Sequence, residues 1–142
     1  MKLPDALTSL ADVLDPATAM RRLVVPMSGN ASSEAVAAVH SLILPPALEA
    51  MAWLYIDDLE RAHDLCQAID DATGAAIHAI VHRREGDFWN SRYWWQRVGG
   101  HPALSGQDPV ELTKVVEAGD VSEATIERQR AEWSALAAFC AA

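Results

Sequence analysis

The sequence predicts an all-α protein, a single-domain helical bundle of about six or seven helices that spans residues 1–142. Apolar residues recur at intervals of three and four along most of the chain, which is the spacing that places them on one face of an α-helix. Only seven Gly and seven Pro interrupt the 142 residues, and no run alternates apolar and polar residues over the length of a strand. Since 51% of the residues are hydrophobic, a chain of this length can bury a sizeable core.

The N-terminal part is expected to hold two helices and a loop. Leucines at helical spacing predict a first helix over residues 5–14. Asp15 and Pro16 start a short second helix, because Asp is a good N-cap and Pro suits the first helical turn. Residues 24–30, VVPMSGN, are expected to form a loop.

Two longer helices and a connection follow. A helix that begins at residue 32 or 33 ends before the Pro-Pro pair at 45–46, because a residue before proline is pushed out of the α region. Its apolar side is formed by Val36, Val39, Leu42 and Ile43. The second proline starts the next helix. The Asp-Asp pair at 57–58 marks a kink or a fresh start in it, and its apolar stripe then continues to Ile69. Residues 70–74 are expected to be a connection.

The centre of the chain is expected to be a helical hairpin, residues 75–85 and 87–98, joined at a Gly-Asp pair. A Gly-Gly pair ends the hairpin, and residues 101–109 form a loop. An Asp-Pro pair starts a helix over about 108–118. The last helix begins near Ser122 and buries one apolar face.

The charge and composition exclude several classes of protein. A formal net charge of −9 argues against a nucleic-acid partner and against an anionic membrane surface, because an acidic domain repels phosphate groups. No stretch has the roughly 18 apolar residues of a membrane span. The first residues lack the apolar core and cleavage site of a signal peptide, so the expected location is cytoplasmic. Cys66 and Cys140 form no CxxC pair and are expected to be buried apolar residues.

Residues 86–98 resemble the second half of a tetratricopeptide repeat. The pattern is G-D-x-x-x-S-x-x-x-W-x-x-V, with Ser91 at the small helix-packing position and Trp95 at the large aromatic position. Pro102 lies near the place of the repeat's terminal proline. A second copy, which begins at Gly119, lacks the aromatic residues. The resemblance implies one tetratricopeptide-like hairpin at the centre of the bundle, since a lone repeat cannot build a solenoid.

Three longer segments resemble an uncharacterised family of small bacterial all-helical proteins. These segments are DDLERAHDL, HxxxHRREGDFxNSRYWWxRVG and QRAEWSAL, and they span most of the chain from Asp57 onward. The resemblance implies an all-helical fold and implies no activity.

Four residues form a candidate metal site. Glu60 and His63 lie three residues apart, and His78 and His82 lie four apart, so each pair falls on one helix face. If the two helices are antiparallel neighbours, the four side chains converge. Imidazoles and a carboxylate suit zinc, and also iron or manganese. The alternative is a set of partly buried histidines that hydrogen-bond nearby carboxylates, such as Asp57, Asp64 or Asp87.

The hairpin also carries arginine and aromatic side chains, which form a second candidate site. Arg83 and Arg92, together with Tyr93, could hold a carboxylate or a phosphate. The alternative is an ion-pair network that fixes the turn of the hairpin, and Arg84, which falls on the apolar side, is expected to be paired or packed. Three tryptophans on one helix cannot all face the same core, so at least one is expected at a groove or partner surface. They are Trp89, Trp94 and Trp95.

These features favour a cytoplasmic binding or interaction module. Its ligand would be a protein, a peptide or a small molecule, held by the hairpin side chains Arg83, Trp89, Arg92, Tyr93 and Trp94. The alternative is a metal-binding protein or metal-dependent enzyme that uses Glu60, His63, His78 and His82. A homodimer that covers the exposed aromatic residues is the third alternative. The sequence indicates no catalytic residues, because GxSxG, HExxH and glycine-rich phosphate loops are absent.

Overall fold

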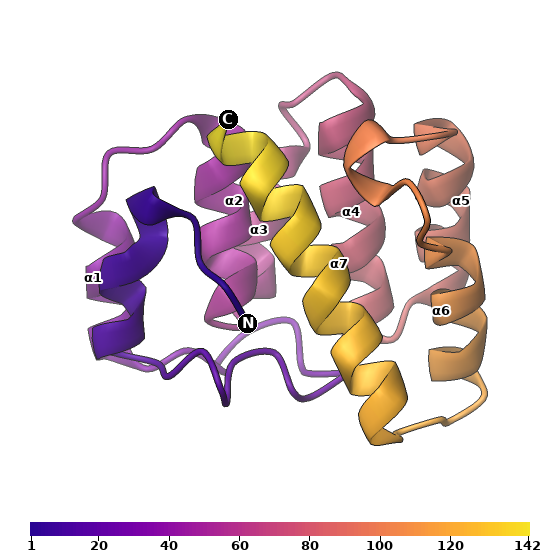
Figure 1. Cartoon of the computed structure of the whole chain (residues 1–142), viewed down its shortest axis with the longest axis horizontal. Helices are drawn as coiled ribbons and strands as arrows, with labels where there is room; N and C mark the ends of the chain where they lie inside the picture. The colour runs from indigo at the N-terminus through magenta and orange to yellow at the C-terminus, as the bar shows by residue number, and fades with distance from the viewer.

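Figure 1 shows the chain as helices and connecting segments without any strand, in a computed structural model that describes residues 1–142. The α-helices are α1 (Ser33–His40), α2 (Pro46–Tyr55), α3 (Leu59–Cys66), α4 (Ala72–Glu85), α5 (Phe88–Val98), α6 (Pro109–Glu117) and α7 (Glu123–Ala141). Two 3-10 segments are η1 (Asp5–Asp12) and η2 (Pro102–Leu104). The predicted all-α class is confirmed. Counting η1 with the α-helices gives eight helices, so the predicted number of six or seven is too low.

Polar side chains cap most of the helix starts. In each case a side-chain oxygen accepts a hydrogen bond from the backbone N–H three residues later, which satisfies one of the donors left free at a helix start. The capping residues are Ser32, Asp58, Asp71, Asp87, Asp108 and Ser122. The predicted cap near residue 32 and the predicted fresh start at 57–58 are therefore confirmed.

Three predicted boundaries are wrong, each for a local reason. The chain at Asp15 forms hydrogen-bonded turns instead of a short helix, with Asp15 Oδ1 accepting from the backbone N–H of Ala17 at 2.8 Å. Helix α1 ends at His40, so Ile43 lies beyond it and is fully exposed. Residues 72–74 are the first turn of α4 and not part of a connection, because the cap is Asp71.

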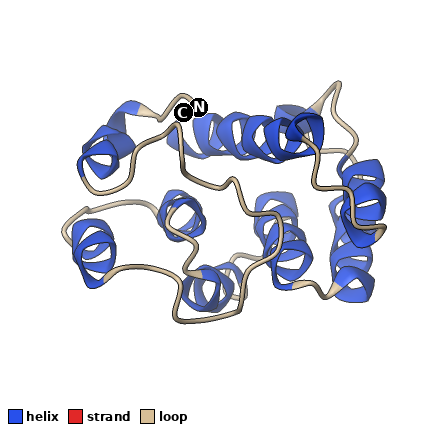
Figure 2. Cartoon of the chain, turned by 90° about the horizontal axis from the view of Figure 1, so that it is seen from below, coloured by secondary structure: helices blue, strands red, loops and turns tan.

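Helix α7 runs diagonally across one face of the molecule in Figure 1, and Figure 2 shows it lying side-on along one side of the other helices. A cluster of 31 buried apolar residues lies beneath it and includes side chains from every α-helix except α6. Trp133 of α7 is fully buried in this core, and its indole N–H donates to the carbonyl of Met51 at 3.0 Å. Helix α6 instead packs through a small satellite cluster that includes Leu112 and Val116.

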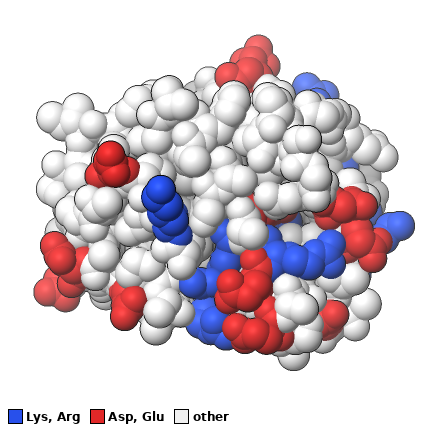
Figure 3. Space-filling view, viewed as in Figure 1, with Lys and Arg blue, Asp and Glu red and all other residues white.

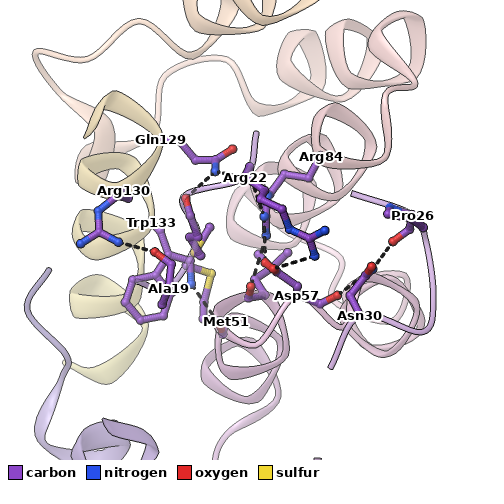
Figure 4. A network of polar contacts seen from close by, with 12 residues as sticks. Ala19, Arg22, Pro26, Asn30, Met51, Asp57, Arg84, Gln129, Arg130 and Trp133 are labelled. Atoms are coloured by element: carbon purple, nitrogen blue, oxygen red, sulfur yellow. Dashed lines mark hydrogen bonds and ion pairs between the residues drawn. The ribbon is translucent and has the colours of Figure 1, made fainter. Parts of the chain in front are cut away.

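Helix α4 is buried on all sides. Every residue from Gly74 to Arg84 is buried, so its polar side chains lie inside the protein and need internal partners. Arg83 donates to both carboxylate oxygens of Glu132 on α7, at 2.6 and 3.2 Å. Arg84 forms an ion pair with Asp57 at 2.8 Å (Figure 4). Both arginines are therefore paired inside the protein, as the ion-pair alternative predicts, but their partners lie on α7 and before α3 and not at the hairpin turn.

The irregular segment 16–31 is held in place by buried side chains from the helices. Gln129 donates to the carbonyl of Met20 at 2.9 Å, and Arg130 donates to the carbonyls of Ala19 and Pro16 (Figure 4). Asn30 donates to the carbonyl of Pro26 within the segment. These bonds satisfy backbone groups that have no helix or sheet partner.

Helices α4 and α5 form the hairpin that carries the candidate sites. Gly86 ends α4 with a φ of 85°, the left-handed conformation that a residue with a side chain rarely adopts. Ser91 on α5 is fully buried and its hydroxyl donates to the carbonyl of Ala79 on α4 at 2.8 Å. A small residue here lets the two helix backbones approach each other.

Charges of both signs lie side by side on part of the face seen in Figure 1. Figure 3 shows blue and red residues next to one another over the N-terminal half of α7, and Arg21 pairs there with Glu123 and Glu127. The net negative charge therefore does not form one continuous acidic patch on this face. None of the helices has the length and apolar character needed to cross a membrane.

Candidate functional site

Three of the four residues in the predicted metal site come together between α3 and α4. His63 lies on α3, and His78 and His82 lie one turn apart on α4. One potential ligand atom from each histidine lies within 4.8 Å of the other two. His63 Nε2 and His78 Nε2 are 3.1 Å apart. Histidines from two neighbouring helices thus present nitrogen atoms to one small volume.

The fourth predicted residue, Glu60, does not join the cluster. Its side chain is exposed on α3, although it lies only three residues before His63. The exposed position of Glu60 means that the cluster consists of three imidazoles with no carboxylate among them. No hydrogen bond joins these histidines to Asp57, Asp64 or Asp87; Asp57 pairs with Arg84, and Asp87 accepts from Asn90. His82 does contact a carboxylate, that of Glu85, so the alternative of histidines bonded to carboxylates holds for one of the three.

Two residues outside the predicted set hold the imidazole rings in place. Glu85 Oε1 lies 2.5 Å from His82 Nδ1, and Gln67 Nε2 lies 2.8 Å from His63 Nδ1. In both contacts the Nδ1 atom is the one that is engaged. Gln67 lies four residues after His63 on the same helix face, so helical spacing could have indicated it.

Trp94 covers the cluster from α5. Its ring stacks on His78 with centroids 3.9 Å apart and an interplanar angle of 13°, and His78 and His82 are 7% and 9% exposed. Burial and the neighbouring His82 and His63 lower the pKa of His78 to about 4. Burial, followed by His82, also lowers the pKa of His63. His63 and His78 are therefore neutral near pH 7, the form in which an imidazole binds a metal.

We expect the metal-free protein to lose stability as the pH falls from 6.5 toward 4. The pKa of His78 is about 4 in the folded chain and about 6.5 when unfolded, so the unfolded chain binds the proton more tightly. The stabilisation is complete above pH 6.5, and His78 alone accounts for a loss of about 2 kcal/mol by pH 5. Urea unfolding of parent and His78→Gln proteins at pH 7.5 and pH 5 measures this difference. Equal losses in the two proteins would contradict it.

An open pocket of about 680 Å³ lies beside the cluster and shares His78, Gln67 and Trp94 with it. It is bounded by the end of α3, the start of α4 and the end of α5. Its remaining charged residues are Asp70, Asp71 and Arg97. A bound group at the histidines would therefore be reached from this pocket.

The predicted arginine and aromatic site forms in part. Trp89, Arg92 and Tyr93 line one small open pocket of about 200 Å³ on α5, and Arg83 and Trp94 do not line it. Arg83 is fully buried against Glu132, so it cannot hold an external anion. Arg92 pairs with Glu117 at 2.5 Å. The tryptophans divide as expected, because Trp95 is in the core, Trp94 is partly buried and Trp89 is 69% exposed. The exposed Trp89 stacks on Tyr93 with centroids 6.1 Å apart.

Glu132 was not among the predicted site residues, although it is the partner of Arg83. The two residues lie 49 positions apart, and no local spacing connects them.

Comparison with protein-family models, curated proteins and solved structures gives no match. The function must therefore be inferred from the chemistry of the histidine cluster and its pocket.

Proposed function

We propose that this protein binds a divalent transition metal, zinc in the first place, through His63, His78 and His82. The observation that carries the proposal is the convergence of three histidine nitrogens within 4.8 Å in a partly buried setting. Imidazole nitrogen is a preferred ligand of zinc, and iron and manganese also accept it.

The spacing of the nitrogens is close to what a metal requires. With zinc–nitrogen distances of about 2.0–2.1 Å and tetrahedral angles, ligand nitrogens lie roughly 3.3 Å apart. The Nε2 atoms of His63 and His78 are already 3.1 Å apart. A ring nitrogen of His82 lies within 4.8 Å of a ring nitrogen of each of the other two, so the three side chains would have to close further around an ion for all of them to bind it.

Metal binding needs a particular proton arrangement, which the surrounding residues can supply. A ligating Nε2 atom must carry no proton, so the ring proton has to be on Nδ1. Glu85 accepts such a proton from His82. At His63 the Gln67 amide nitrogen lies 2.8 Å from Nδ1, so the amide must turn over before its oxygen can accept the His63 proton. Carboxylate and amide partners of this kind fix the tautomer of metal-binding histidines.

Three protein ligands leave one tetrahedral position open. Catalytic zinc sites have this composition, and a water in the open position becomes a nucleophile near neutral pH. Of the three histidines, His78 lines the neighbouring pocket, so a small molecule would approach the ion past His78. We therefore infer that the site has a Lewis-acid function, which makes a metal-dependent enzyme the class of activity to test.

We expect untagged protein, purified without chelators and supplied with Zn²⁺, to hold close to one metal ion per chain. The His63→Ala, His78→Ala double variant should hold less than about a tenth of this, because one remaining imidazole cannot retain the ion. Elemental analysis by mass spectrometry measures the content. Glu85→Gln should keep the ion but bind it about 10–100-fold more weakly.

His40→Ala is the matched control, since His40 is an exposed histidine on α1. It should retain the metal content of the parent. A parent that remains metal-free in excess Zn²⁺, while circular dichroism shows it folded, would rule out the proposal. The exposed Trp89 and Tyr93 would then become the leading candidate site.

Several predictions remain alongside this proposal. The exposed stack of Trp89 and Tyr93 supports a second candidate function, a surface that binds a protein or peptide partner or a second copy of the chain. The tetratricopeptide resemblance is supported by the close contact between Ser91 and Ala79, and it stays a prediction. The bacterial family and the cytoplasmic location also stay predictions.

A further inference from the structure

We propose that the pocket beside the histidine cluster binds a small zwitterion, a free amino acid. This inference deepens the proposed function, because the pocket and the proposed metal site share His78. It is carried by the charges around the pocket. Arg97 lies on the α5 side, and Asp70 and Asp71 lie on the side formed by the segment between α3 and α4.

Arg97 is the group that would hold the carboxylate. No carboxylate oxygen of the protein lies within 4.0 Å of its guanidinium, and its only polar side-chain contact is with the hydroxyl of Tyr93 at 3.5 Å. The guanidinium lies over the rings of Tyr93 and Trp94, 5.8 and 5.3 Å from their centroids. The rings orient the guanidinium and leave its donors free for a two-point bond to a carboxylate.

Asp70 is the group that would hold the ammonium. Its carboxylate is exposed and has no hydrogen-bond or ion-pair partner in the protein. Asp71, by contrast, is engaged as the cap of α4, since its Oδ1 accepts from the backbone N–H of Gly74 at 2.9 Å. One free anion and one free cation therefore face the same pocket.

Opposite charges on one pocket select for opposite charges on one ligand. A simple anion would meet two carboxylates, and a simple cation would meet Arg97 as well as the proposed metal. A zwitterion satisfies both sides at once. Ile69 and Trp94 supply an apolar wall for a side chain, and a volume of about 680 Å³ is in the range of small-molecule sites.

The test uses metal-free protein, because free amino acids chelate divalent metals. The twenty common L-amino acids are screened by thermal shift at about 10 mM, a concentration that detects millimolar dissociation constants. The best ligand is then titrated by calorimetry, together with its N-acetyl and its amide derivative. We expect at least one amino acid to bind, and each derivative to bind at least about tenfold more weakly, because each lacks one charge.

Two variants assign the charges to residues. Arg97→Gln should weaken amino-acid binding at least about tenfold, and this variant should bind the amino acid and its amide equally well. Asp70→Asn should also weaken amino-acid binding at least about tenfold, and this variant should bind the amino acid and its N-acetyl derivative equally well. Arg128→Gln is the matched control, since Arg128 lies on α7 outside the pocket. Absence of binding by every amino acid, or unchanged binding in both variants, would overturn the inference.

The failure of this inference is distinguishable from failure of the proposed function. If the parent binds metal but no amino acid, the result contradicts the zwitterion pocket and supports the metal site. If it binds an amino acid but no metal, the result contradicts the metal site and supports the pocket.

Discussion

Replacement of Glu132 by alanine should destabilise the protein by about 3–5 kcal/mol, because it leaves the Arg83 guanidinium buried without a counter-charge. Arg83 is fully buried, Glu132 is 1% exposed, and they share two hydrogen bonds. Arg83 Nε has no hydrogen-bond partner inside the protein. Urea unfolding followed by tryptophan fluorescence measures the free energy of unfolding.

A double variant separates the charge from the space that the side chains fill. Arg83→Met, Glu132→Leu removes both charges and keeps apolar bulk, so it should be much more stable than Glu132→Ala alone, and an apolar pair can match a buried ion pair. Glu117→Ala, which removes the exposed partner of Arg92, should change the stability by less than about 1 kcal/mol. A Glu132→Ala protein within about 1 kcal/mol of the parent would contradict this account.

Replacement of Gly74 by alanine should destabilise the protein by about 3 kcal/mol or more, although alanine is the better helix former. A Cβ atom at this position would lie 2.0 Å from the carbonyl oxygen of Ile69 and 2.8 Å from its carbonyl carbon. Both are backbone atoms of the segment that leads into α4, so relief requires movement of the chain. The midpoint of thermal or urea unfolding measures the loss.

Gly100→Ala is the control for this substitution. An added Cβ at Gly100 meets no atom within 4 Å, and its φ lies outside the left-handed region. Its stability should stay within about 1 kcal/mol of the parent. If Gly74→Ala proved as stable as the parent, the close approach of Ile69 to α4 would be wrong, and so would the shape of that side of the pocket.

The sequence was informative about the histidines because their relation is local. His78 and His82 are one turn apart, and short connections make α3 and α4 neighbours, so the convergence with His63 follows from spacing and chain length. Glu60 shows the limit of this reasoning. It is only three residues from His63, yet the way α3 packs leaves it exposed, and no sequence pattern fixes that rotation.

Long-range partners were beyond local patterns. The position of Arg84 among apolar residues indicated a buried, paired guanidinium, and the structure has this arrangement. The partner of Arg83 lies 49 positions away and depends on how α7 crosses α4. The same is true of Gly74, because its tight contact with Ile69 depends on the path of the preceding turn.

The bonds that hold segment 16–31 have a consequence for cooperativity. Arg130 and Pro16 are 114 positions apart in the chain, so their contact closes a loop that contains nearly all of the helices. The entropy lost in closing such a loop grows only slowly with its length. Once the loop is closed, the early segment and the last helix are tied to the buried α4, and the histidine cluster on α4 belongs to the same cooperative unit as both ends of the fold.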